Sequence, residues 1–208
     1  VQHEKEGAVM VFPYYHAGEV SFIKYRPVNN KKGMWTSANS VPCLFGMQLV
    51  PANSREIIIV EGELDAMAFA EAGFYAVSVP RGGGEGAKQD GWIDTHWEEL
   101  QLFDTIYLAL DSDKEGKLAS EYIAKRLGQH RCFIMDFGPF KDANNALLAG
   151  YDFAQLFQEA KTHDPEELKH VTEYTESVID FFREGPNTKG TPLPWHKTHE
   201  RIRLRHGE

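Results

Sequence analysis

The sequence has few cysteines and lacks the long apolar runs of a membrane protein. Only two of its 208 residues are cysteine, Cys43 and Cys132, and neither belongs to a Cys-x-x-Cys pair. This count excludes a disulfide-stabilised scaffold, and the missing pairs exclude a zinc ribbon within the chain. Both cysteines lie in apolar segments, which predicts buried free thiols. No apolar run approaches the roughly 20 residues that a membrane span requires, and no signal peptide is visible.

Positive charge is also scarce, because 22 Lys and Arg residues stand against 31 Asp and Glu residues. The net charge of −9 argues against a protein that coats nucleic acid with a broadly basic surface, although it is compatible with a local basic groove. The chain has no P-loop motif, so it cannot itself be an ATP-driven helicase. Its nine histidines show no metal-ligand spacing.

Two continuous apolar runs, residues 57–60 and 106–110, each lead into a group of acids. Because neither run alternates with polar residues, both predict buried strands of a parallel sheet. The acidic groups are Glu61-Gly62-Glu63-Leu64-Asp65 and Asp111-Ser112-Asp113. The ends of such strands meet at the ligand-binding edge of an open α/β fold. Converging carboxylates repel one another unless a divalent cation separates them, and Mg²⁺ commonly bridges carboxylates to phosphates, so metal-dependent phosphoryl or nucleotidyl chemistry is predicted.

Strand and helix patterns alternate over residues 55–150. A helix over residues 63–71 is expected to have Leu64, Met67 and Ala68 on one apolar face and to end at Gly73. A later helix over residues 116–128 is expected to turn four residues inward, Leu118, Tyr122, Ile123 and Leu127. These alternating elements predict an α/β architecture.

A glycine-rich loop, Pro80-Arg81-Gly82-Gly83-Gly84-Glu85-Gly86-Ala87, follows a strand expected at residues 76–79. Glycines permit close approach to a phosphate but also simply make loops flexible, so both interpretations of this loop stay open. Lys114 could contact a phosphate or be a solvated residue at a helix start. Asn144 or Asn145 is expected to cap a further helix through its side chain.

The first 50 residues have a different pattern. Residues 8–12 and 20–25 predict two antiparallel strands joined by a turn near Ala17-Gly18. Lys24 and Arg26 alternate on one face of the second strand. They could meet phosphates or be solvated strand positions.

The acidic groups resemble those of the Toprim domain, the metal-binding fold shared by primases, topoisomerases and some nucleases. That family places a Glu-Gly after one strand and an Asp-x-Asp after a later one, which here are Glu61-Gly62 and Asp111-Ser112-Asp113. Asp65 matches an acidic position after the Glu-Gly, and Lys141-Asp142-Ala143-Asn144 resembles a further motif of primase-type members. The long glycine loop, and Asn145 where an acid is common, depart from the primase pattern.

Segments before the first acidic group sharpen this resemblance. They are similar to the subdomain that precedes Toprim in phage primase–helicases and Twinkle, and they are Val11-Phe12-Pro13-Tyr14, Gly18-Glu19-Val20, Lys24-Tyr25-Arg26 and Leu44-Phe45-Gly46. The resemblance implies a Toprim fold, with a parallel-type sheet flanked by helices, over residues 54–150. A small, mainly antiparallel β subdomain would occupy residues 1–53. A helical extension and linker without strands would occupy residues 151–208 and lead to a helicase domain.

The activity that the resemblance implies is that of a DNA primase, a nucleotidyltransferase that makes short RNA primers on single-stranded DNA from nucleoside triphosphates. Glu61, Asp111 and Asp113 would be catalytic, with Glu61 as metal ligand or general base. The ligands of Mg²⁺ or Mn²⁺ would be Glu61, Asp65, Asp111, Asp113 and Asp142. The residues that contact nucleotide or DNA would be Lys24, Arg26, Arg81, Lys114 and Lys141.

Two other interpretations stay open. In Twinkle of animals the corresponding region has lost its acidic set and serves DNA binding and assembly, and Toprim nucleases use the same acids to cleave nucleic acid. Expected partners are a helicase domain and, if the parent protein carries one, an upstream zinc-binding domain, with no membrane. The expected location is the cytoplasm of a bacterial or phage-infected cell, or the mitochondrion for a Twinkle homologue. The fragment itself is expected to be monomeric.

Overall fold

The computed structural model describes residues 1–3, 7–30, 33–38, 41–80 and 90–162, together with residues 175, 179, 191–192 and 203–204. The chain divides into two compact units, Val1–His163 and Asp164–Glu208. In the second unit, β10 (Thr191–Pro192) and β11 (Arg203–Leu204) form an antiparallel pair. Most of the predicted helical tail and linker lies outside the described residues. None of the described helices is both long enough and apolar enough to cross a membrane.

A five-stranded sheet forms the centre of the first unit, in the order β6-β5-β7-β8-β9. Its strands are β5 (Glu56–Val60), β6 (Ala76–Ser78), β7 (Thr105–Ala109), β8 (Cys132–Ile134) and β9 (Lys161–Thr162). The first four in spatial order run parallel, and β9 pairs antiparallel with β8. The expectation that no strand follows residue 150 was therefore wrong, because β9 extends this sheet.

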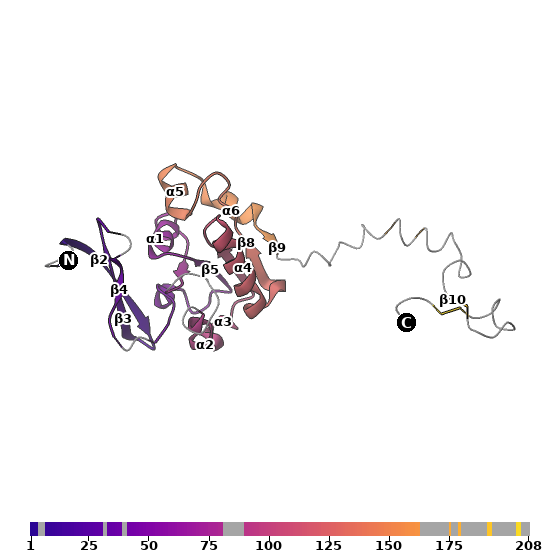
Figure 1. Cartoon of the computed structure of the whole chain (residues 1–208), viewed down its shortest axis with the longest axis horizontal. Coiled ribbons are helices and arrows are strands. Elements are labelled where there is room, and N and C mark those ends of the chain that lie inside the picture. Colours follow the sequence, from indigo (N-terminus) through magenta and orange to yellow (C-terminus); the bar gives the residue numbers. More distant parts are fainter. Residues whose placement is uncertain are drawn as a thin grey trace. The chain divides into compact units, whose positions relative to one another are not determined.

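Helices cover both faces of the sheet, as the continuous apolar runs predict. Along β5, Ile57 and Ile59 pack into one core and Ile58 and Val60 into another. Complete burial of such a side chain stabilises the fold by roughly 1.5–3 kcal/mol. The first core includes residues of α2 (Gly91–Thr95), α3 (Trp97–Leu100) and α4 (Lys114–Leu127). The second includes residues of α1 (Glu63–Glu71), α5 (Ala143–Leu148) and α6 (Phe153–Glu159), and Figure 1 shows α5 and α6 across the strands from α2 and α3. The predicted α/β architecture is confirmed.

Most of the predicted inward positions of two helices are buried, including Ala68 in α1 and Ile123 and Leu127 in α4. Two positions differ, because Met67 in α1 is 47% exposed and Leu118 in α4 is 55% exposed. In α1, Ala66 is buried beside Ala68, since small residues allow a helix to lie close to a sheet. The predicted end of α1 is confirmed, since Gly73 has a φ of 89° that favours glycine.

A second, smaller sheet precedes these elements and has the order β1-β2-β3-β4 with antiparallel pairing throughout. Its strands are β1 (Gln2–His3), β2 (Gly7–His16), β3 (Glu19–Pro27) and β4 (Trp35–Thr36). The predicted turn is confirmed, with left-handed backbone at Ala17 (φ 50°) and Gly18 (φ 82°). Short 3₁₀ helices, η2 (Met47–Leu49) and η3 (Gln129–Arg131), complete the unit.

The inner face of the small sheet packs against the α/β part of the unit. Phe12, Tyr14 and Phe22 form a core with the buried, free Cys43. Leu64 of α1 packs against this core. The same helix therefore carries residues of the first acidic group and supports the small sheet, so the two sheets meet at the acids.

Candidate functional site

The first and second acidic groups follow neighbouring strands of the central sheet. Glu61 comes directly after β5, and Asp111 comes two residues after the end of β7. β5 and β7 are neighbours in the sheet, but the strand that follows β5 in sequence, β6, lies on the outer side of β5, and the strand that follows β7, β8, lies on the outer side of β7. Such a switch point, at the carboxyl ends of the strands, is where open α/β sheets bind ligands.

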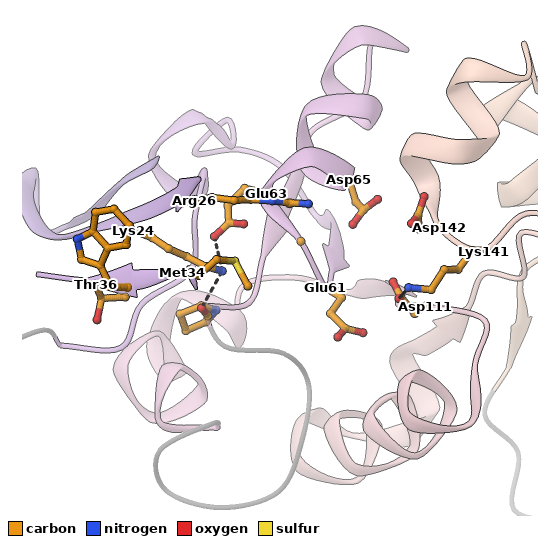
Figure 2. Close-up of a pocket in the computed structure, with 13 residues that line it drawn as sticks. Lys24, Arg26, Met34, Thr36, Glu61, Glu63, Asp65, Asp111, Lys141 and Asp142 are labelled. Atoms are coloured by element: carbon orange, nitrogen blue, oxygen red, sulfur yellow. Dashed lines mark hydrogen bonds and ion pairs between the residues drawn. The ribbon is translucent and has the colours of Figure 1, made fainter. Parts of the chain in front are cut away.

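A pocket of about 660 Å³ lies at this switch point (Figure 2). One part of its wall comes from β3, β4 and the residue before β4, and the rest comes from the edge of the central sheet and its following loops. The pocket is lined by Lys24, Arg26, Met34, Trp35, Thr36, Glu61, Gly62, Glu63, Asp65, Pro80, Asp111, Lys141 and Asp142. The fold thus brings together four of the predicted acids and three of the predicted cations, from segments far apart in the sequence.

The carboxylates of this pocket influence one another. Burial raises the pKa of Glu61, and the charges of Asp111 and Asp113 raise it further. Burial likewise raises the pKa of Asp65 to about 6, and the charges of Asp142 and Asp111 add to this effect. Each shift means that ionisation is unfavourable in the protein alone. An additional cation in the pocket would relieve this repulsion.

Part of the acidic charge is already compensated by the protein. Lys141 Nζ lies 2.8 Å from Asp111 Oδ2, and this contact raises the pKa of the Lys141 ammonium. The backbone N–H of Ser112 donates to the carbonyl of Lys141 at 3.0 Å, which ties the loop after β7 to the loop before α5. Lys141 is therefore held beside the acids, although its side chain is 61% exposed.

Asp113 has a different place from Asp111. Its Oδ1 accepts a hydrogen bond from Gly116 N at 2.9 Å and caps α4. Asp113 and Lys114 are exposed, and neither lines the pocket. Gly116 permits this arrangement, because a Cβ at that position would lie 2.1 Å from the carbonyl oxygen of Asp111. The first turn of α4 thus packs directly against the backbone that carries Asp111.

The start of α5 is also organised by acids. Asp142 is its N-cap, with Oδ1 accepting from Asn145 N at 2.8 Å. The expectation that Asn144 or Asn145 caps the helix through its side chain was wrong. Instead, Asn144 N donates to Asp65 Oδ1 at 3.1 Å, so α1 and α5 are joined at the pocket.

Glu63 was not among the predicted site residues, yet it is the most buried acid of the pocket at 2% exposure. Its Oε1 accepts from Tyr14 OH at 2.5 Å and lies 2.7 Å from Lys24 Nζ. Lys24 also donates to the carbonyl of Pro80 at 3.3 Å. Burial and the charge of Glu63 raise the pKa of Tyr14. The only feature of the sequence that could have indicated this burial is the position of Glu63 in the helix. It lies three residues before Ala66 and therefore shares the buried face of α1.

Arg26 is the other cation that the small sheet contributes. It is half-buried and lines the pocket, and within the described part of the chain no hydrogen bond or ion pair engages its guanidinium. It therefore offers donors to a ligand, whereas Lys24 is already engaged. Arg81, predicted to contact nucleotide or DNA, lies outside the described residues.

The donor set was tested against the divalent cation predicted from the sequence. Among the described residues, no three Asp, Glu, His or Cys side chains are grouped closely enough to hold one metal ion. The chemistry is nevertheless suitable, because the pocket supplies only oxygen ligands of the kind that Mg²⁺ prefers. Burial first, and the neighbouring carboxylates second, raise the pKa values of Glu61 and Asp65, so their charged forms are poorly stabilised in the protein alone.

A comparison with protein families matches residues 58–147 to the Toprim-like family. These residues form a Toprim-like domain. The match spans β5 to α5 and includes both predicted acidic motifs. The predicted relationship to the Toprim modules of primases and Twinkle-like proteins is confirmed by this match and by the relatives described next.

Two relatives from Arabidopsis thaliana match 68% of this chain, each over 159 residues. One is a primase homolog protein with 34% identity, and the other is a chloroplastic/mitochondrial Twinkle homolog protein with 33% identity. The matches cover 46% and 22% of these proteins, so the chain spans about half of the first relative and a fifth of the second. The primase fragment of the bacteriophage T7 primase-helicase protein is similar in structure, with a TM-score of 0.61 and 25% identity over 73% of this chain and 63% of that one.

Proposed function

We propose that this chain is the primer-synthesising module of a primase–helicase. It would catalyse metal-dependent nucleotidyl transfer and make short RNA primers on single-stranded DNA. The Toprim-like domain and the similarity to a primase homolog and a primase fragment support this assignment. A helicase domain elsewhere in the parent protein is proposed as the partner, on the strength of the primase-helicase relative.

One observation carries the proposal most directly: acids and cations face a single pocket from two different sheets. Nucleotidyl transfer needs charge stabilisation on the triphosphate and a base near the attacking hydroxyl. In our proposal Arg26 binds triphosphate oxygens, because its guanidinium has no partner in the described part of the chain. Lys24 adds positive charge from a position fixed by Glu63.

The acids of the Toprim-like domain would hold the metal. Glu61, Asp65, Asp111 and Asp142 line the pocket, and Asp113 lies beside Asp111 at the start of α4. When bound, Mg²⁺ or Mn²⁺ would neutralise charge that develops on the phosphates. Glu61 would serve either as a metal ligand or as the general base that accepts a proton from the attacking 3′-hydroxyl.

A second function is favoured by the contact between Lys141 and Asp111 at 2.8 Å. An ammonium already neutralises a carboxylate that a primase would use for metal. A binding and assembly module without catalysis needs no metal, so this ion pair agrees with the alternative, as does the similarity to a Twinkle homolog.

One gel separates these functions. The protein is incubated with labelled nucleoside triphosphates, mixed-sequence single-stranded DNA and Mg²⁺ or Mn²⁺. We expect short template-dependent RNA, and we expect its loss in the double variant Asp111→Asn/Asp113→Asn. Asp104→Asn is a matched control, because Asp104 is 75% exposed and outside the pocket. Loss of the DNA itself would indicate a nuclease, and DNA binding without synthesis, even after an upstream zinc-binding domain is added, would indicate the binding module.

A further inference from the structure

The small sheet has an apolar outer face that is covered only in part, since Val9 on this face is buried whereas its neighbours toward β4 are partly exposed. Paired residues of antiparallel strands share a face, and Tyr25 pairs with both Val11 and Trp35. These three side chains are on the other face of the sheet from Phe12 and Phe22, which belong to the buried inner core. All three are only partly buried. An antiparallel sheet with one packed face usually presents polar residues on the other, so this composition suggests an interaction surface.

Aromatic rings on this face are already ordered as a stack. The rings of Tyr25 and Trp35 lie 5.2 Å apart between centroids and are inclined by 12°. His3 lies 5.1 Å from Trp35 at an angle of 55°. Rings held in this way present a flat surface whose side-chain entropy is already reduced, so a planar ligand can bind with little further ordering.

This surface is continuous with the pocket. Trp35 lies on β4, the edge strand of the small sheet, and it also lines the pocket. Met34, which is 47% exposed, and Thr36 line the pocket beside it. Figure 2 shows both on the side of the pocket remote from Asp111. Arg26 follows Tyr25 on β3 and lines the pocket from the opposite sheet face, so a ring and a guanidinium occupy successive positions of this strand.

We propose that Tyr25 and Trp35 form a stacking platform for an unpaired nucleobase of a single nucleic-acid strand that leaves the pocket across β4. The proposal rests on the proposed function, because it takes the pocket to hold the nucleotides being joined. A base matches the flat apolar rings through its π-face, and the phosphate next to it matches Arg26. This combination of ring and adjacent cation favours a nucleic-acid strand over a protein partner, which would need no phosphate-binding group at this edge.

The experiment compares two labelled ten-unit oligomers by fluorescence anisotropy at fixed salt. One is oligothymidylate, and the other has the same sugar–phosphate backbone without bases. We expect Trp35→Leu to weaken oligothymidylate binding by about 5- to 100-fold, the equivalent of one stacked base, and to leave the abasic oligomer unaffected. Trp35→Phe should bind within about threefold of the original protein because it keeps an aromatic ring. Trp97→Leu, at a tryptophan that is 44% exposed on α3, is the matched control and should change neither affinity.

A second measurement needs no destabilising substitution. Oligothymidylate should quench tryptophan fluorescence in the original protein, whereas the abasic oligomer should not, and Trp35→Phe should remove the quenching.

The platform would be rejected if Trp35→Leu bound oligothymidylate normally while Arg26→Ala weakened the binding of both oligomers. The proposed function would then still stand. Conversely, primer synthesis without quenching would reject only the platform. Self-association that disappears in Trp35→Leu, with unchanged oligomer binding, would make this face a protein interface instead.

Discussion

Glu63 and Asp65 lie two residues apart on α1, and their carboxylates face the same pocket in opposite electrostatic surroundings. Glu63 is almost fully buried, but it has Lys24 at 2.7 Å and the Tyr14 hydroxyl at 2.5 Å. Asp65 accepts the backbone N–H of Asn144, and its strongest charged neighbours are Asp142 and Asp111. Its pKa rises to about 6 as a result of burial and this repulsion.

The difference separates two kinds of pocket wall. In the wall around Glu63, which we call the paired wall, the carboxylate is neutralised by Lys24, and this contact joins the two sheets and fixes the lysine in place. The wall around Asp65 and Glu61, which we call the acidic wall, carries an excess of negative charge. This excess lowers the stability of the protein alone and favours a bound cation. Clusters of carboxylates that repel one another in this way are typical of functional sites.

The largest effect is expected from Gly116→Ala, which disturbs the acidic wall without removing an acid. The added Cβ would overlap the Asp111 carbonyl oxygen at 2.1 Å, so α4 and the Asp111 loop must move apart. This overlap should outweigh the gain of about 1 kcal/mol in helix propensity. A displacement of about 1 Å can cost roughly 100-fold in rate, so primer synthesis should fall by that order.

Gel-based primer synthesis and urea unfolding would measure the effect of Gly116→Ala. Lys117→Ala, at the exposed next residue of α4, is the control and should behave like the original protein. Full activity in Gly116→Ala would show that the packing of α4 against Asp111 does not position the acidic wall.

The next largest effect is expected from substitution of Glu63, in the paired wall of the pocket. Glu63→Ala should lower the free energy of unfolding by about 3 kcal/mol, because it leaves Lys24 and the Tyr14 hydroxyl without their shared partner in a buried place. Glu63→Gln should cost less, since an amide oxygen still accepts the tyrosine proton. Urea unfolding would measure both variants.

Glu71→Ala, at an exposed acid of the same helix, is the reference for Glu63→Ala. If Glu71→Ala and Glu63→Ala had the same free energy of unfolding, the ion pair between Glu63 and Lys24 would not stabilise the packing of the two sheets.

An effect of similar size but opposite sign is expected for Asp65→Asn. The pKa of Asp65 is raised from 3.8 to about 6, so ionisation lowers stability progressively as the pH rises from about 4 to 6. The asparagine cannot ionise, and without divalent cations it should be more stable than the original protein at pH 7 by about 3 kcal/mol. The two proteins should be equally stable near pH 4. Urea unfolding in EDTA at both pH values would show whether the difference appears only at the higher pH.

The smallest effect is expected for Lys141→Gln. The ion pair is largely exposed, so its loss should change stability by less than about 1 kcal/mol. It should, however, leave Asp111 uncompensated and tighten Mn²⁺ binding by about two- to fivefold, as measured by titration calorimetry. Weaker Mn²⁺ binding would show that Lys141 does not compete with the metal, which would remove the observation that favours the binding module.

Much of the central sheet could be predicted from the sequence. The continuous apolar runs before Glu61 and Asp111 required burial on both faces, which only a covered parallel sheet provides. The glycine at position 73 correctly marked the end of α1. The inward faces of α1 and α4 were predicted except at Met67 and Leu118, which lie outside because alanines at positions 66 and 119 fill the contact.

The candidate site was predictable only in part. Acids that follow strands of one sheet must approach each other, so the presence of Glu61 and Asp111 in one pocket followed from the pattern. The partners of each acid did not follow, because capping, ion pairing and metal binding all use the same side chains. Asp113 and Asp142 thus cap helices, where local pattern alone suggested an asparagine cap for α5.

The sequence by itself determined the parallel strands of the central sheet and the edge at which the acids gather, because continuous apolar runs and the acids that follow them are local features of the chain. Only the tertiary structure decided which acid is neutralised and which is left in repulsion. Tyr14 and Glu63 are 49 positions apart and meet only when the two sheets pack together. Charge compensation depends on such distances and on burial, and neither is a property of the sequence near the acid.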